Sequence, residues 1–230
     1  SLQKTALNFY RQTIYNRRKS TQSAIYRPQE EEFVLKKMIL VTSPPACGKT
    51  YISKQLAKNL KHVVYLDKDT LIVLSNRIFD VAGEERNRSS DFFESNIRNY
   101  EYEAIINIAM EALDYDDIVL INAPFTREIR NPEYMDQFRK RLAMKNARLE
   151  IIWVVTAPEI CHQRMIHRNS SRDTWRLENW DKYISGVDFS IPSAIDRPDS
   201  SDDDLLLFYN STDQEYQESM KRIVGILEEN

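Results

Sequence analysis

Short apolar runs alternate with longer amphipathic segments along most of this chain. The apolar runs lack a regular apolar–polar alternation, which is typical of strands that are buried on both faces. Between these runs, apolar residues recur every three or four positions, which predicts helices. The predicted strands are 38–42, 63–66, 118–121, 149–155 and 205–208, and the predicted helices are 48–60, 69–78, 91–115, 132–145, 158–168 and 213–228. Strands separated by helices predict one parallel sheet with helices on both faces, a three-layer α/β domain.

The inward side of the longest predicted helix, 91–115, is marked by Phe93, Ile97, Ile105, Ile108 and Ala112. Its length and its apolar spacing predict that it covers one face of the sheet.

The first 36 residues differ from this alternating pattern. Leu7, Tyr10 and Ile14 recur at helical spacing, which predicts a helix over about residues 2–18, and a polar connecting loop follows it. This helix either packs on the domain or, because arginines lie among its apolar positions, forms an arm for nucleic acid or another partner. We therefore divide the chain into residues 1–36 and a main domain at 37–230.

Composition and charge exclude several classes of protein. Hydrophobic residues make up 42% of the 230 residues, enough for a sizeable core, and no apolar run approaches the ~20 residues of a membrane-spanning helix. The net charge of −3 argues against a chain built mainly to hold nucleic acid. The two cysteines, Cys47 and Cys161, have no metal-ligand spacing and predict no disulfide framework, which favours a reducing, cytoplasmic setting. The sequence leaves the oligomeric state open.

The clearest motif is Ser-Pro-Pro-Ala-Cys-Gly-Lys-Thr at residues 43–50, between a predicted strand and a predicted helix. It matches the phosphate-binding pattern G-x-x-x-x-G-K-[ST] except that Ser43 replaces the first glycine. Backbone N–H groups of such a loop point into one concavity, where the helix dipole favours negative charge. Lys49 is predicted to hold the β and γ phosphates of ATP, and Thr50 is predicted to offer its hydroxyl to Mg²⁺. The predicted nucleotide-binding residues are Pro45, Ala46, Cys47, Gly48, Lys49, Thr50 and Tyr51.

Two residues of this loop need an interpretation of their own. Ser43 is small enough to preserve the loop, and its hydroxyl is expected to turn back on the loop. We interpret Cys47 as a small loop residue rather than as a nucleophile. Gly48 is one of only four glycines in the chain and stands at the position that the motif requires.

An acidic pair follows the second predicted strand. The helix after the loop runs roughly 18 Å away, and the strand returns about 17 Å, so Asp67 and Asp69 are expected near the phosphates. A carboxylate there can take the proton of an acceptor hydroxyl. We predict Asp69 as this base and as a second Mg²⁺ ligand, and we place Asp67 on the substrate side. The alternative is that Asp69 only caps the next helix.

The segments ILVTSPPACGKTYISKQLAKNL and VVYLDKDTL resemble the P-loop kinases around zeta toxin, chloramphenicol phosphotransferase and the kinase domain of polynucleotide kinases, with their AAA-type ATP-binding domain. The resemblance covers roughly residues 37–230. It implies the strand order 2-3-1-4-5 and, for Asp69, the role of general base. It also implies a lid around 164–185, in which Arg164 lies near the adenine while Arg168 and Arg172 reach the phosphates. On the residues alone, these arginines are better interpreted as solvated surface residues that pair with Glu159, Asp173 and Glu178.

The remaining candidates lie after predicted strands. Asn122 stands where many P-loop enzymes have the aspartate of the Mg²⁺ site. Arg127 is predicted to hold substrate or to bond a carboxylate. Asn210 is predicted to contact the nucleotide base, or else to belong to a turn and helix cap. His162 and His167 lack a metal-ligand spacing, so no zinc site is expected.

These features predict a phosphotransferase that moves the γ-phosphate of ATP to a hydroxyl of a small molecule or nucleotide-like acceptor. One alternative, motivated by Ser43 and Asn122, is an ATP-binding regulatory module without transfer activity. Another is a polynucleotide 5′-hydroxyl kinase, although the chain offers no basic, aromatic-lined groove for nucleic acid. No membrane partner is expected.

Overall fold

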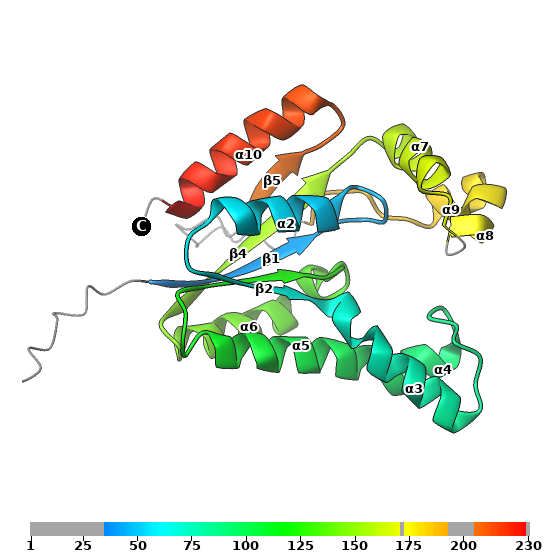
Figure 1. Cartoon of the computed structure of the whole chain (residues 1–230), viewed down its shortest axis with the longest axis horizontal. Coiled ribbons are helices and arrows are strands. Elements are labelled where there is room, and N and C mark those ends of the chain that lie inside the picture. Colours follow the sequence, from blue (N-terminus) through cyan, green and yellow to red (C-terminus); the bar gives the residue numbers. More distant parts are fainter. Residues whose placement is uncertain (1–34, 171–172, 193–204, 229–230) are drawn as a thin grey trace, which may run out of the picture. The chain divides into compact units, whose positions relative to one another are not determined.

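The computed structural model describes residues 35–170, 173–192 and 205–228. Its strands form one parallel sheet in the predicted order β2-β3-β1-β4-β5 (Figure 1). The strands are β1 (Lys36–Thr42), β2 (Val63–Asp67), β3 (Ile118–Asn122), β4 (Ala147–Val155) and β5 (Leu205–Tyr209). The predicted three-layer α/β fold is therefore confirmed. The helix and loop predicted for residues 1–34, and Arg172, lie outside the described residues.

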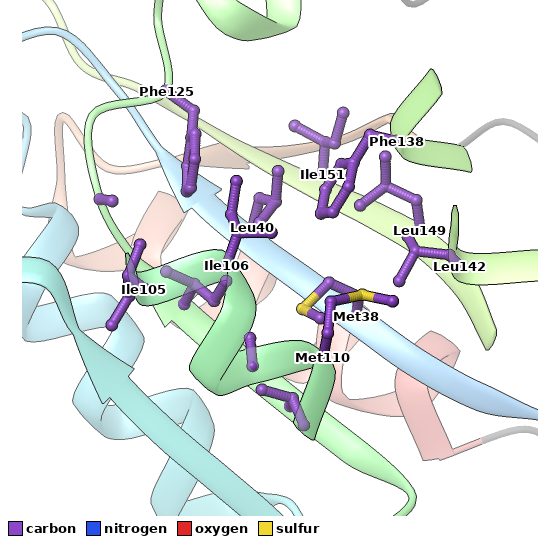
Figure 2. Close-up of a cluster of buried hydrophobic side chains, with 14 of the residues drawn as sticks. Met38, Leu40, Ile105, Ile106, Met110, Phe125, Phe138, Leu142, Leu149 and Ile151 are labelled. Carbon is purple, nitrogen blue, oxygen red and sulfur yellow. The ribbon is translucent and has the colours of Figure 1, made fainter. Parts of the chain in front are cut away.

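Alternate residues of β1 face opposite sides of the sheet, so each side has its own core. Met38 and Leu40 pack with α5 (Asn99–Ala112) and α6 (Pro132–Ala143), as Figure 2 shows. Ile39 and Val41 belong to the opposite core, with α2 (Lys49–Asn59) and α10 (Asp213–Glu228). All four side chains are at most 1% exposed. Burial on both faces is the reason that this strand reads as an unbroken apolar run.

Local signals set several helix boundaries. The Asn131 side chain accepts hydrogen bonds from the backbone N–H groups of Glu133 and Tyr134, and Pro132 occupies the first turn of α6. Helix α7 (Pro158–Arg168) also begins at a proline, and it ends at Asn169, whose φ of 45° is left-handed. The bounds of α7 are the predicted ones. None of the helices in the described part of the chain is long and apolar enough to cross a membrane.

The segment between β2 and β3 is more irregular than predicted. The helix expected at 69–78 is a 3₁₀ turn, η1 (Lys68–Leu71), followed by α3 (Ile72–Ala82). The helix expected at 91–115 consists of α4 (Asp91–Phe93), a π-helical turn η2 (Glu94–Arg98) and α5.

One predicted inward position of this long helix is wrong. Ile108 is 43% exposed, whereas Ile105, Ile106 and Ala109 are buried. Ile105 and Ile108 both lie in α5, beyond the π turn of η2, so the π turn does not account for this error. At ~3.6 residues per turn, the buried residues Ile105, Ile106 and Ala109 define the inward face of α5, and Ile108 projects outside that face.

Three short elements complete the described part of the chain. They are η3 (Glu128–Arg130) after β3, and α8 (Thr174–Glu178) and α9 (Trp180–Ser185) after α7. Helices α7, α8 and α9 follow one another beyond the carboxyl end of β4 (Figure 1). They occupy the region for which the sequence predicts a lid.

Candidate active site

The strand order brings distant polar residues to one edge of the sheet. Because β1 lies between β3 and β4, the loop that follows β1 is flanked by the carboxyl ends of both neighbours. The first polar residues at the ends of β3, β4 and β5 are Asn122, Thr156 and Asn210, and all three are buried. Buried polar groups need hydrogen-bond partners. Each of these finds its partner in the loop or in the first turn of α2.

The backbone of the loop at 43–48 curves tightly, and two of its residues have a left-handed conformation. Gly48 has a φ of 94°, and Ala46 has a φ of 64°. A Cβ atom added at Gly48 would lie 2.5 Å from Nδ2 of Asn210, so it would displace the side chain that bonds the Cys47 carbonyl, and the positive φ itself favours glycine. The Ser43 hydroxyl donates to the carbonyl of Pro44 at 2.8 Å, as expected from the sequence. Helix α2 begins at Lys49 with no acidic residue in its first turn, so no carboxylate of the first turn competes for its positive end.

One carbonyl anchors this loop. The Cys47 oxygen accepts hydrogen bonds from Asn210 Nδ2 at 2.7 Å, Thr156 Oγ1 at 3.0 Å and Arg164 Nη1 at 3.2 Å. Arg164 also donates from Nη2 to the carbonyl of Asn210 at 2.8 Å. The structure thus brings Arg164 and Asn210 together at the phosphate loop. The Asn210 side chain bonds this loop, whereas the side-chain contact at the start of α10 is made by Thr212, which accepts from the backbone N–H of Glu215.

The two cysteines meet beneath the loop. Their Sγ atoms lie 3.5 Å apart, although the residues are 114 positions apart in the sequence. Both are free thiols and both are buried. The hydrogen bond to Cys161, together with burial, raises the pKa of the Cys47 thiol. A thiol held in its protonated form is a poor nucleophile, in keeping with the interpretation of Cys47 as a packing residue.

The Asn122 side chain lies at the centre of the hydrogen bonds of the site, and Asn122 is only 2% exposed. Its Oδ1 accepts from Lys49 Nζ at 2.6 Å. Its Nδ2 lies 2.8 Å from Asp67 Oδ2 and 3.3 Å from Thr50 Oγ1. The Tyr65 hydroxyl is 3.2 Å from the same nitrogen and donates to Asp67 Oδ2 at 3.0 Å. One amide therefore joins the loop lysine, the loop threonine and a carboxylate from β2.

The chemistry of its neighbours explains why this position holds an amide. Lys49 can only donate, so it must face the amide oxygen, whereas a carboxylate such as that of Asp67 accepts and must face the nitrogen. An aspartate at 122 would place two carboxylates in contact, which is unfavourable. The carboxylate that contacts this amide, Asp67, comes from the second strand. The sequence indicates the asparagine at 122 but not this contact between strands.

The acidic turn after β2 separates the two aspartates. The Asp67 side chain caps η1 by accepting from the backbone N–H of Asp69 at 3.0 Å, so the alternative of Asp69 as the cap is wrong. The Asp69 carboxylate is 58% exposed, and its Oδ1 lies 3.8 Å from Lys68 Nζ. Asp67 therefore contacts the Asn122 amide nitrogen, which also contacts Thr50, while most of the Asp69 carboxylate is exposed to solvent. Of the two predicted Mg²⁺ ligands, only Thr50 belongs to the Asn122 network among the described contacts.

A buried ion network behind the turn fixes this geometry. Lys68, between the two aspartates, is 4% exposed and donates to Glu101 of α5 at 2.8 Å. Arg88 and Ser75 also donate to the Glu101 carboxylate. Burial alone would raise the pKa of Glu101, but hydrogen bonds from Arg88, Lys68 and Ser75 outweigh it and lower the pKa to about 2. The anchored Lys68 leaves the turn little freedom to rotate either aspartate.

We expect this network to make the free energy of unfolding depend on pH in the acid range. A carboxyl whose pKa falls from 4.5 unfolded to about 2 folded contributes about 3 kcal/mol above pH 5, and the contribution is lost as the pH falls through the folded value. We expect Glu101→Gln to lower the free energy of unfolding at pH 7, and we expect its deficit relative to the wild type to narrow by about 2 kcal/mol by pH 3. Urea unfolding across this pH range measures both effects.

The matched control is Glu103→Gln, because Glu103 is exposed on the same helix. Its stability is expected to stay within about 0.5 kcal/mol of the wild type. A deficit of Glu101→Gln that stays constant with pH would show that the Glu101 carboxyl does not titrate as the network requires.

The other predicted arginines are paired. Arg168 of α7 donates from Nε to Asp173 Oδ2 at 2.8 Å, whereas Arg172 lies outside the described residues. Arg127, after β3, donates to the Glu94 carboxylate at 2.7 and 3.1 Å, which lowers the pKa of Glu94. Arg127 thus bonds a carboxylate, which is one of the two roles predicted for it from the sequence. It also lines a pocket of about 420 Å³ between α5, η3 and α6, together with Tyr102 and other residues.

Comparison with known proteins identifies the family. An AAA domain family model matches residues 38–189, well over half of the chain. The chain belongs to this AAA domain family. The curated proteins contain no match to it.

Solved structures resemble this AAA domain in fold. A protein from Chloroflexus aurantiacus J-10-fl with a provisional kinase assignment is 19% identical, with a TM-score of 0.53 over 84% of this chain and 97% of that one. A gluconokinase from Sinorhizobium meliloti 1021 is 12% identical, with a TM-score of 0.47 and coverages of 84% and 96%. A shikimate kinase from Bacteroides thetaiotaomicron is 14% identical, with a TM-score of 0.42 and coverages of 84% and 98%. At these identities, the likeness concerns the fold alone.

The residues of this AAA domain fit a nucleotide and a magnesium ion. The glycine-only position at Gly48 and the positive end of α2 suit phosphate. Thr50 and Asp67 present a hydroxyl and a carboxylate oxygen around one amide, and oxygen atoms are the ligands that Mg²⁺ prefers. No group of three or more His, Cys, Asp or Glu side chains in the described ranges forms a metal cage. That is usual for Mg²⁺, which keeps waters and substrate phosphates among its ligands.

Proposed function

We propose that this AAA domain is an ATP-dependent phosphotransferase that moves the γ-phosphate of ATP to a hydroxyl of a small-molecule or nucleotide-like acceptor. The observation that carries the proposal is the Asn122 network. It brings Lys49, Thr50 and Asp67 to the end of the phosphate loop, and the exposed Asp69 follows Asp67 by two residues. A cation, an oxygen pair for a metal and an exposed carboxylate at one sheet edge are the parts that phosphoryl transfer needs.

In this proposal each residue has a separate role. The loop N–H groups and the Lys49 ammonium bind the phosphates and stabilise the charge that develops on them during transfer. Thr50 and Asp67 would hold Mg²⁺, which neutralises phosphate charge when it is bound. Asp69 orients the acceptor hydroxyl and takes its proton. We therefore assign the metal-side carboxylate to Asp67 rather than to Asp69.

The nucleotide and acceptor ends of the site are assigned by position. Arg164 and Asn210, which meet at the Cys47 carbonyl, would form the wall on the side of the base. The acceptor would lie on the other side, toward α3, η2 and Arg127. Together with the Asp-Lys-Asp-Thr segment after β2, this arrangement supports placing the protein with the kinases around zeta toxin and chloramphenicol phosphotransferase.

The test is a transfer assay with γ-labelled ATP and Mg²⁺. Purified protein is incubated with pools of hydroxyl-bearing metabolites, antibiotics, nucleotide sugars and oligonucleotides, and labelled products are separated from inorganic phosphate. We expect label in at least one small-molecule pool and none in the same pool with Lys49→Met. Protein that binds ATP but labels no pool would contradict the proposal and favour a regulatory nucleotide-binding module. Label confined to oligonucleotides would favour a polynucleotide kinase.

A further inference from the structure

Two thiols lie together beneath the phosphate loop, and the proposed transfer reaction uses neither of them. The Sγ atoms of Cys47 and Cys161 are 3.5 Å apart, and both thiols are free. Their other polar contacts are longer, to the carbonyl oxygens of Pro45 at 3.9 Å and Thr156 at 4.0 Å. In a disulfide the two sulfur atoms are about 2.05 Å apart. The sulfur atoms therefore need to approach by only about 1.5 Å to form a bond.

The two thiols differ in their readiness to react. A hydrogen bond from the Cys47 thiol lowers the pKa of Cys161, and the charge of Arg164, one turn further along α7, also lowers it against the opposing effect of burial. The same pairing raises the pKa of Cys47. The thiolate is the form of cysteine that reacts with oxidants. Cys161 is therefore the thiol that attacks an oxidant, and Cys47 is positioned to react with the product.

Burial decides which oxidants reach this pair. Cys47 is 1% exposed and Cys161 has no exposed surface. Both side chains belong to the core that the sheet forms with α2 and α10. A disulfide of peptide size, such as glutathione disulfide, has no path to these sulfur atoms in the folded protein. Hydrogen peroxide is close to water in size, so a small local opening admits it.

The pair is connected to the nucleotide site through the backbone of Cys47. The Cys47 carbonyl accepts three hydrogen bonds, from side chains that follow β4 and β5 and from α7. The next residue is Gly48, with a left-handed φ of 94°. A covalent bond from Cys47 to Cys161 would draw the loop toward α7 and out of this arrangement. Displacements of about 1 Å in a preorganised site cost up to about 10²-fold in function.

We propose that Cys47 and Cys161 are a site of reversible oxidation by hydrogen peroxide, and that their disulfide holds the phosphate loop in a state with low affinity for ATP. The inference rests on the proposed function in one respect, that this loop binds ATP. Transient disulfides of this kind are the usual ones in a reducing compartment.

The oxidation proceeds in two steps. The Cys161 thiolate attacks peroxide, so that an S–O bond forms, the O–O bond breaks and hydroxide leaves, which gives a sulfenic acid. The Cys47 sulfur then attacks the Cys161 sulfur, the S–S bond forms, the S–O bond breaks and the oxygen leaves as water with the Cys47 proton. In total the two thiols lose two electrons and two protons, and one peroxide becomes two waters. A small dithiol such as dithiothreitol reverses the change.

Mass spectrometry tests the modification without reference to activity. Folded protein is treated with hydrogen peroxide, denatured and alkylated with iodoacetamide. We expect the treated wild type to have two hydrogen atoms fewer at this pair and to take up no alkyl group there, whereas untreated protein takes up two. Glutathione disulfide is expected to leave both thiols free. In Cys47→Ala the reaction should stop at the Cys161 sulfenic acid, which dimedone traps.

Calorimetry with ATP tests the effect on the loop. We expect oxidation to weaken ATP binding of the wild type at least about tenfold and dithiothreitol to restore it. Dithiothreitol does not reduce methionine sulfoxide, so recovery assigns the loss to the disulfide. The matched control is Cys161→Ala, a small apolar replacement outside the loop. It is expected to bind ATP as the reduced wild type does, before and after peroxide.

The outcomes separate this inference from the function on which it rests. Two free thiols after peroxide treatment would overturn the oxidation site, and a disulfide with unchanged ATP affinity would overturn its effect on the loop; both leave the transfer assay on reduced protein as it was. Reversible loss of ATP affinity, in a protein that transfers phosphate to no acceptor, would support this inference and contradict the kinase proposal. Reduced protein without affinity for ATP would contradict both.

Discussion

Replacing Asp69 with asparagine is expected to lower the rate of phosphate transfer by about 10²- to 10⁴-fold. The asparagine keeps the size of the side chain but cannot take a proton from the acceptor. The Asp69 carboxylate is more than half exposed and the main polar contact of the turn is made by Asp67, so the fold and the ATP site should be preserved. Transfer assays at saturating ATP measure the rate, and calorimetry is expected to give wild-type ATP affinity.

The control for this variant is Asp213→Asn, which removes an exposed carboxylate at the start of α10. It should transfer phosphate at the wild-type rate. A normal rate in Asp69→Asn would contradict its assignment as the base. If transfer were then lost in Asp67→Asn without loss of Mg²⁺-dependent ATP binding, Asp67 would be the base instead.

Replacing Lys49 with methionine is expected to lower kcat/KM for ATP by about 10²- to 10³-fold, similar to the loss of one preorganised donor at developing charge. Methionine keeps much of the aliphatic stem and removes the ammonium. The change also removes the 2.6 Å hydrogen bond from Lys49 to Asn122, so the Asn122 oxygen loses its shorter donor and keeps the 3.5 Å contact with the Ser53 hydroxyl. Both steady-state kinetics and ATP binding should report the loss.

Lys54→Met is the matched control, because Lys54 is exposed on the same helix. Its kcat/KM and its melting temperature should equal those of the wild type. Wild-type ATP binding and transfer in Lys49→Met would contradict the assignment of the phosphate site. A fall in melting temperature as large as that of a core substitution would instead indicate that Lys49 serves mainly to hold Asn122 in place.

Local patterns in the sequence predicted much of the fold. The apolar run at 38–42 indicated a strand buried on both faces, and Met38 and Ile39 indeed enter opposite cores. Pro158 and Asn169 bound α7 at the predicted residues. The strand order was expected from the family resemblance and not from the periodicity. The periodicity did not indicate the π turn at η2, and it placed the exposed Ile108 on the inward face of α5.

The candidate site was predicted in its parts but not in its connections. The positions of Lys49, Asp67 and Asn122 in the sequence indicated that all three lie at one sheet edge. The contact of Asn122 with both others, and the division of roles between Asp67 and Asp69, depend on the side chains of separate strands. A rule that examines the first polar residue after each parallel strand would have found Thr156 as well.

The sequence by itself determined the elements of this protein and the order of its chemical groups, because helix periodicity, strand burial and loop motifs depend on neighbours within a few residues. Tertiary structure decided which groups meet. Only the sheet order places residue 122 beside residue 49, residue 210 beside residue 47 and the sulfur of Cys161 beside that of Cys47. Such contacts depend on packing between distant segments, for which local periodicity carries no signal.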